Sequence, residues 1–195
     1  PGDWGGLYFT GAGGGTLNQV QIQHAQYGLQ LGGTGSITLK DSSMSQIYLY
    51  DLYLSSVTTG GLTVTGTRLE GPSWWYTATV FLAQTNPAAI SVTNSQLLPG
   101  ASGQIVSTSY SGTTYAGQTA NFSNNWWGTS DPVTIQQKIS DYTDGLANAP
   151  LIDFTPFLDA PNGNPVPGNF VWGPLLSNAT WTAAQSPYLM IDTVT

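Results

Sequence analysis

The sequence predicts an all-β protein folded as a right-handed parallel β-helix, a solenoid whose coils stack their strands into sheets. Three observations predict this fold. A short phrase of alternating apolar and polar residues recurs along the chain, turns rich in glycine or proline separate its copies, and the copies return at irregular intervals of ~17 to 30 residues. Alternation is typical of strands with one buried face, and such repetition is typical of a solenoid.

Two series of strands are expected in the first 123 residues. The first series comprises residues 20–23, 37–40, 62–65, 90–93 and 120–123. The second comprises residues 6–9, 28–31, 46–49, 79–82 and 104–107. Because the two series alternate, each coil is predicted to contribute one strand to each of two stacked sheets, with parallel pairing between successive coils.

The pattern changes after residue 124. Asp131 is suited to an N-cap, Pro132 to the first helical position, and three apolar residues follow at helical spacing, so a short helix is predicted near residues 131–140. One more strand is expected at residues 151–154, which completes a β-helix domain over residues 1–158. Residues 159–174 are rich in proline and glycine and are expected to form a linker, and residues 175–195 an extended C-terminal arm with a terminal strand.

The composition argues against several partners. Only 7% of the 195 residues are charged, and the formal net charge is −7, so no cationic surface for nucleic acid or anionic membranes is expected. No run of about 18 apolar residues is present, which predicts no membrane insertion. The low content of lysine and glutamate fits an extracellular or cell-surface location. The lack of cysteine excludes disulfides and thiolate metal sites.

The sequence contains no evident arrangement for catalysis. None of the ten acidic residues falls in a paired motif within the solenoid, although Asp51 and Glu70 are candidates to approach each other on adjacent coils. His24 is the single histidine and has no acidic neighbour. Arg68 and Glu70 are two residues apart and are expected to form a surface ion pair. We therefore predict no catalytic residues and no cofactor.

Two further kinds of site have weak support. Asp141, Asp144 and Asp153 are a candidate calcium site, but their spacing lacks the pattern of a calcium loop, and capping of a helix end and of turns is the favoured interpretation. Asn121 and Asn178 fit the acceptor pattern for N-glycosylation, which often arises by chance.

Trp74, Trp75 and Tyr76 form an aromatic cluster in a long corner. Contact with a protein partner, contact with a sugar and plain packing all remain open for these rings. The outward positions of the strands carry a mixture of Gln, Thr, Lys, Ser and Asn, which makes an ice-binding threonine array a minor alternative.

Three stretches resemble right-handed parallel β-helix repeat proteins of bacterial and archaeal cell surfaces. Residues 125–158, with Asn125-Trp126-Trp127-Gly128, Asp131-Pro132 and Phe154-Thr155-Pro156-Phe157-Leu158, are similar to the closing segment of those proteins. Residues 1–9 (PGDWGGLYF) are similar to a segment inside the helix, and residues 176–195 to its beginning. The resemblance implies the fold and leaves the function open, because this architecture carries lyases, hydrolases, adhesins and inert fibres.

The order of these stretches differs from that of the family, since the chain starts with an internal segment and finishes with one that resembles a start. The chain is then either one unit of a tandem array or a subunit whose C-terminal strand reaches a neighbour. We expect a non-enzymatic structural protein of an extracellular filament, which assembles head to tail with itself. The expected assembly residues are Trp4, Leu7, Phe9, Trp181, Tyr188, Leu189, Met190, Ile191 and Val194. The alternative is a carbohydrate-binding or carbohydrate-active β-helix, with glycans as partners.

Overall fold

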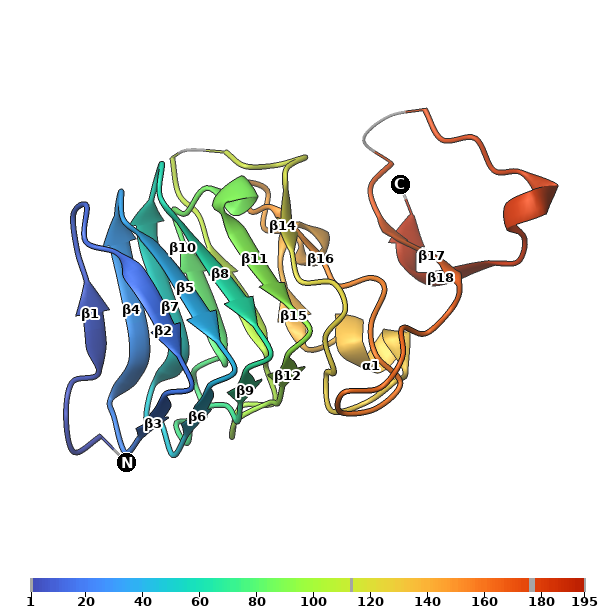
Figure 1. Ribbon diagram of the computed structural model, residues 1–195. Coiled ribbons are helices and arrows are strands. Elements are labelled where there is room, and N and C mark those ends of the chain that lie inside the picture. Colours follow the sequence, from blue (N-terminus) through green and yellow to red (C-terminus); the bar gives the residue numbers. More distant parts are fainter. Residues whose placement is uncertain (1, 113, 176–177, 195) are drawn as a thin grey trace.

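A computed structural model describes residues 2–112, 114–175 and 178–194, and it confirms an all-β parallel solenoid with one short α-helix in this part of the chain (Figure 1). Each of the first four coils contributes a strand to each of three parallel sheets, and the next two coils contribute to two sheets. Sheet 1 contains β1 (Leu7–Phe9), β4 (Tyr27–Gly33), β7 (Tyr50–Val57), β10 (Val80–Ala83), β13 (Val106–Ser109) and β15 (Ile139–Ser140).

The other two sheets complete each coil. Sheet 2 contains β2 (Gly15–Asn18), β5 (Ser36–Lys40), β8 (Gly61–Thr65), β11 (Ile90–Thr93), β14 (Thr119–Asn121) and β16 (Leu151–Asp153). Sheet 3 contains β3 (Gln21–Gln23), β6 (Ser43–Ser45), β9 (Arg68–Leu69) and β12 (Gln96–Leu97). Short 3₁₀ helices occur at Pro87–Ala89, Tyr142–Asp144 and Ala183–Gln185.

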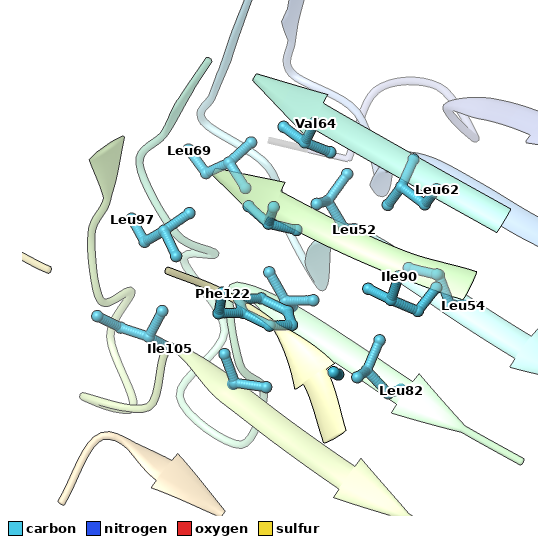
Figure 2. Close-up of a cluster of buried hydrophobic side chains, with 14 of the residues drawn as sticks. Leu52, Leu54, Leu62, Val64, Leu69, Leu82, Ile90, Leu97, Ile105 and Phe122 are labelled. Carbon is cyan, nitrogen blue, oxygen red and sulfur yellow. The ribbon is translucent and has the colours of Figure 1, made fainter. Parts of the chain in front are cut away.

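The strand register stacks apolar residues of successive coils on one another inside the solenoid. Leu52 pairs with Leu29 on one side and Val80 on the other, and Leu62 pairs with Ile37 and Ile90. All six side chains are buried, and Figure 2 shows Leu52, Leu62 and Ile90 among the side chains that fill the space between the sheets. Burying one such side chain contributes roughly 1.5–3 kcal/mol, so the repeated phrase stabilises the stack one coil at a time.

The predicted strand series is wrong in two places. Residues 20–23 contain β3 and belong to sheet 3, while β2 occupies the corresponding place in sheet 2. Residues 46–49 form a corner, because Gln46 adopts a left-handed φ of 54° and interrupts the extended backbone. Sheet 3 was absent from the prediction because its strands have only two or three residues.

A ladder of polar side chains runs through the corner between sheets 2 and 3. The second to fifth coils each place one polar residue there, and a backbone N–H of the preceding coil donates to it: Ser42 N–H to Thr67 Oγ1, Thr67 N–H to Ser95 Oγ, and Ser95 N–H to Asn125 Oδ1. The residue just before each of them has a positive φ, at Asp41, Gly66, Asn94 and Asn124. The ladder satisfies backbone donors that the turn would otherwise leave buried and unpaired.

Replacing Asn125 with alanine is expected to lower the free energy of unfolding by about 3 kcal/mol. The buried Asn125 amide accepts from Ser95 N–H at 2.9 Å and donates to Val92 O at 2.7 Å and Phe122 O at 2.8 Å. Urea unfolding followed by circular dichroism measures the loss. Asn121→Ala, at an exposed position, is the matched control, and an equal effect of the two substitutions contradicts the role of the ladder.

The predicted short helix is present as α1 (Pro132–Gln136), with Asp131 as its N-cap and Pro132 in its first turn. The Asp131 carboxylate accepts from Thr134 N–H at 3.1 Å. The helix is shorter than predicted. Ile135 is buried, whereas Val133 is 43% exposed and Ile139 belongs to β15, so the expected apolar stripe is reduced to a single buried contact.

The segment after β16 covers the last coil and then leaves the body. Phe170 packs on Phe157 and Trp172 on Phe154, with ring centroids 5.1 and 4.8 Å apart. These two rings belong to β17 (Asn169–Gly173), which pairs in parallel with β18 (Tyr188–Val194). The region expected to be a linker therefore contains a strand. Figure 1 shows this two-stranded sheet at the opposite end of the molecule from β1.

Candidate interaction surfaces

The ionisable side chains are dispersed over the solenoid. No group of three or more His, Asp and Glu residues suited to a metal ion occurs in the described ranges. Arg68 Nε and Glu70 Oε1 lie 2.9 Å apart and both side chains are largely exposed, which confirms the predicted surface ion pair. Arg68 also donates to Gln96 Oε1 on the next coil.

Asp51 is an exception because its carboxyl group is fully buried. Its Oδ2 accepts from Gly71 N–H at 3.0 Å, and its Oδ1 has no hydrogen-bond partner. Burial raises the pKa of Asp51 to about 8, the Gly71 N–H lowers it, and the charge of Glu70 adds to the rise. The two acids therefore do interact, as the sequence suggested. Asp51 faces the core, however, and a buried acid has no access to a substrate.

The three aspartates of the candidate calcium site are each engaged in local capping. Asp141 accepts from Ile152 N–H and Thr143 N–H, both at 2.8 Å, and Asp144 accepts from Asp141 N–H at 3.0 Å. Asp153 accepts from Thr155 N–H at 3.1 Å. Burial raises the pKa of Asp141. These contacts fit the capping interpretation.

Trp74, Trp75 and Tyr76 lie on an exposed loop between β9 and β10, which we call the aromatic loop (residues 73–77). The exposed fractions of the three rings are 38%, 67% and 79%. Both ends of the loop are fixed to neighbouring coils, since Trp74 N–H donates to Tyr48 O at 3.0 Å and Ser102 Oγ donates to Thr77 O. The Trp74 ring also lies 5.2 Å from the Tyr48 ring. The loop is thus anchored while its tip faces solvent.

A second aromatic group, which the sequence did not reveal, covers the outer side of sheet 1. It consists of Tyr27, Tyr50, Tyr53 and Phe81, and we call it the aromatic face. Tyr53 is paired directly with Phe81 and Tyr27 with Tyr50. Ring centroids within the group lie 5.0 to 6.1 Å apart, and the rings are only partly buried. Burial raises the pKa of Tyr27 and of Tyr50, and the neighbouring Tyr53 adds to the rise at both.

The first coil is less well covered than the second. Leu7, Phe9 and Leu17 are half-buried, whereas the residues with which they pair one coil further on, Leu29, Leu31 and Leu39, are at most 1% exposed. Within the described sheets, β1, β2 and β3 each have a neighbour on one side only. Trp4 is 42% exposed, and its Nε1 donates to Gln23 O at 2.9 Å. Apolar side chains and backbone hydrogen-bonding groups are therefore available together at this end.

The other expected assembly residues lie around β18. Leu189 and Met190 are 49% and 44% exposed, while Ile191 is 7% exposed and lines a cavity of about 300 Å³ beside Val133 and Gln136 of α1. The ring of Trp181, itself 47% exposed, stacks on that of Tyr188 at 5.4 Å. Val194 belongs to β18, but its side chain lies outside the described residues.

The two candidate glycosylation sites differ in their surroundings. Asn178 is exposed. Asn121 lies on β14, where its Oδ1 accepts from Ser123 N–H and its Nδ2 donates to Ser91 Oγ. A glycan is attached at Nδ2, so its attachment to Asn121 competes with the hydrogen bond to Ser91 Oγ.

Comparison with family models, with curated proteins and with solved structures found no match to this chain. None of the helices that the structure describes is long and apolar enough to cross a membrane. Fold and surface chemistry are therefore the basis for inferring function. They define a parallel β-solenoid, a class consistent with structural and repeat proteins.

Proposed function

We propose that this protein is a non-enzymatic, extracellular structural solenoid whose copies associate head to tail, with β18 of one copy adding to the exposed edge of β1 in the next. The observation that carries this proposal is the incomplete cover of the first coil. Leu7, Phe9 and Leu17 are half-buried, whereas the residues at the same positions of the second coil are fully buried. Each coil of a solenoid is stabilised by its neighbours, so a strand added to β1 supplies this coil with a second neighbour.

The opposite end supplies a suitable occupant. The sheet of β17 and β18 has two strands in the described residues, so β18 is paired on one side only. Its strands pair in parallel, as those of the solenoid do, and Leu189 and Met190 expose apolar surface. Adding β18 to β1 continues parallel pairing from one copy to the next. The two contacting surfaces differ, so the contact is heterologous and produces an open filament.

Charged substitutions on β18 test the proposal. The double variant Leu189→Lys, Met190→Lys is expected to reduce association by about tenfold or more, because lysine at a pairing edge disfavours strand addition. Sedimentation velocity measures the association, and electron microscopy shows whether filaments form.

Leu146→Lys is the matched control, since Leu146 is 38% exposed and belongs to neither β1 nor β18. Equal association of the wild type and the double variant contradicts the proposal. So does a wild type that stays monomeric at every concentration tested.

A further inference from the structure

We infer that the aromatic face and the adjoining aromatic loop together form a binding surface for a neutral glycan chain. This inference is independent of assembly, because the surface lies on the side of the solenoid rather than at its ends. The two groups are adjacent: Tyr48, which contacts Trp74, lies two residues before Tyr50 at the start of β7.

The arrangement of the rings suits stacking on sugars. Tyr53 and Phe81 are nearly parallel, with an interplanar angle of 14°, but Tyr27 stands at 69° to Tyr53 and Tyr50 at 49°. Because the rings are inclined to one another, the group does not form a single closed stack. All four residues are only partly buried, so part of each side chain stays accessible to solvent. Pyranose rings contact aromatic faces through their C–H groups and form hydrogen bonds through their hydroxyls.

The neighbouring side chains are neutral hydrogen-bonding groups. Strand pairing places Tyr8, Gln30, Tyr53, Phe81 and Ser107 in one row along sheet 1, one residue per coil. Gln30 and Ser107 thus lie on either side of the two rings. Strands are spaced by about 4.8 Å, a step comparable with the length of one sugar residue in a chain.

Charge determines which glycans fit. Asp51 is the one acidic or basic residue in the six strands of sheet 1, and it is buried. The aromatic loop, residues 73–77, has none. This surface offers no cation to an acidic polysaccharide, and the net charge of −7 repels polyanions from the whole molecule. A neutral glycan chain is not repelled in this way.

The surface is also preorganised. The rings of the aromatic face are held by parallel strands, and the aromatic loop is anchored at both ends by hydrogen bonds to neighbouring coils. Little conformational entropy is then lost on binding. Packing between rings explains why the aromatic face stabilises the sheet, but it does not explain why Trp75 and Tyr76 are 67% and 79% exposed.

Calorimetric titration of the full chain with soluble neutral hexasaccharides tests the inference. The probes are cellohexaose, laminarihexaose and mannohexaose, with hexagalacturonate as the acidic counterpart. Tryptophan fluorescence provides a second readout, and the part of its change that Trp75→Ala removes reports on the aromatic loop. At least one neutral hexasaccharide is expected to bind, and hexagalacturonate is expected not to bind. The variants Trp75→Ala and Tyr50→Ser with Tyr53→Ser should each weaken binding by about tenfold or more.

Leu146→Ala is the matched control, because Leu146 is 38% exposed outside the aromatic face and the aromatic loop, and its loss should leave affinity unchanged. Trp75→Ala removes a ring from an exposed loop, which keeps the test valid if the double variant on sheet 1 fails to fold. Failure of all three neutral probes to bind overturns the inference, as does preferential binding of hexagalacturonate or equal affinity in all variants. Loss of self-association in the Trp75→Ala variant, without sugar binding, identifies the surface as a protein interface and also overturns it.

Discussion

Replacing Trp127 with alanine is expected to lower the free energy of unfolding by about 4 kcal/mol, because it opens a large cavity under the last coils. Trp127 is fully buried, and its ring lies 6.3 Å from that of Phe122 and 6.2 Å from that of Phe154. The Phe154 ring in turn contacts Trp172 of β17. Truncating Trp127 therefore removes the support on which the C-terminal segment packs. Urea unfolding measures the change.

Trp127→Phe is the control for this substitution. The Nε1 of Trp127 is buried and has no hydrogen-bond partner, so phenylalanine removes an unpaired donor while keeping most of the packing. We expect a loss of about 1 kcal/mol for this variant. If alanine and phenylalanine have the same effect, the aromatic contacts do not hold this end of the solenoid together.

The stability of the protein is expected to depend on pH through Asp51. The pKa of this carboxyl is about 8 in the folded protein, against a usual value of 3.8. Between those values the folded state keeps a proton that the unfolded state has lost. The contribution of Asp51 to the free energy of unfolding is therefore fully present below pH 3.8. It falls by about 1.4 kcal/mol for each pH unit until the pH passes 8.

Asp51→Asn removes this dependence. Relative to the wild type, the variant should gain about 4 kcal/mol between pH 4.5 and pH 7.5. Urea unfolding at several pH values measures both slopes, and the comparison separates Asp51 from Asp141, whose pKa is also raised by burial. Asp3→Asn, at an exposed position, should leave the slope unchanged. Parallel curves for the wild type and Asp51→Asn contradict the assignment.

The sequence predicted the solenoid because alternation within a strand is a local property. Strands such as Ile90–Thr93 keep two inward residues, which any period-two pattern reveals. The polar ladder was not predicted, although the sequence carries a signal for it. A residue that tolerates a positive φ, such as Asp41 or Asn94, is followed each time by Ser, Thr or Asn. Recognising it required knowledge that these side chains point inward at a corner.

The aromatic face could not be predicted from the sequence, for a different reason. Tyr27, Tyr50, Tyr53 and Phe81 meet only through strand register, and the coil length is irregular. Ladder residues on successive coils are separated by 25, 28 and then 30 residues. Without a constant period, outward positions on different coils cannot be aligned from sequence. The aromatic loop was found because its three rings are consecutive in the chain.

Cross-linking between copies tests head-to-tail association most directly. The natural chain has no cysteine, so a single introduced cysteine reports one contact. Tyr8→Cys on β1 is to be mixed under mild oxidation with Leu189→Cys or Met190→Cys on β18, and with Leu146→Cys as control. We predict a disulfide between Tyr8→Cys and at least one β18 variant, because residues on adjacent strands lie within disulfide range. No such disulfide, or one formed equally well with Leu146→Cys, contradicts the proposed association.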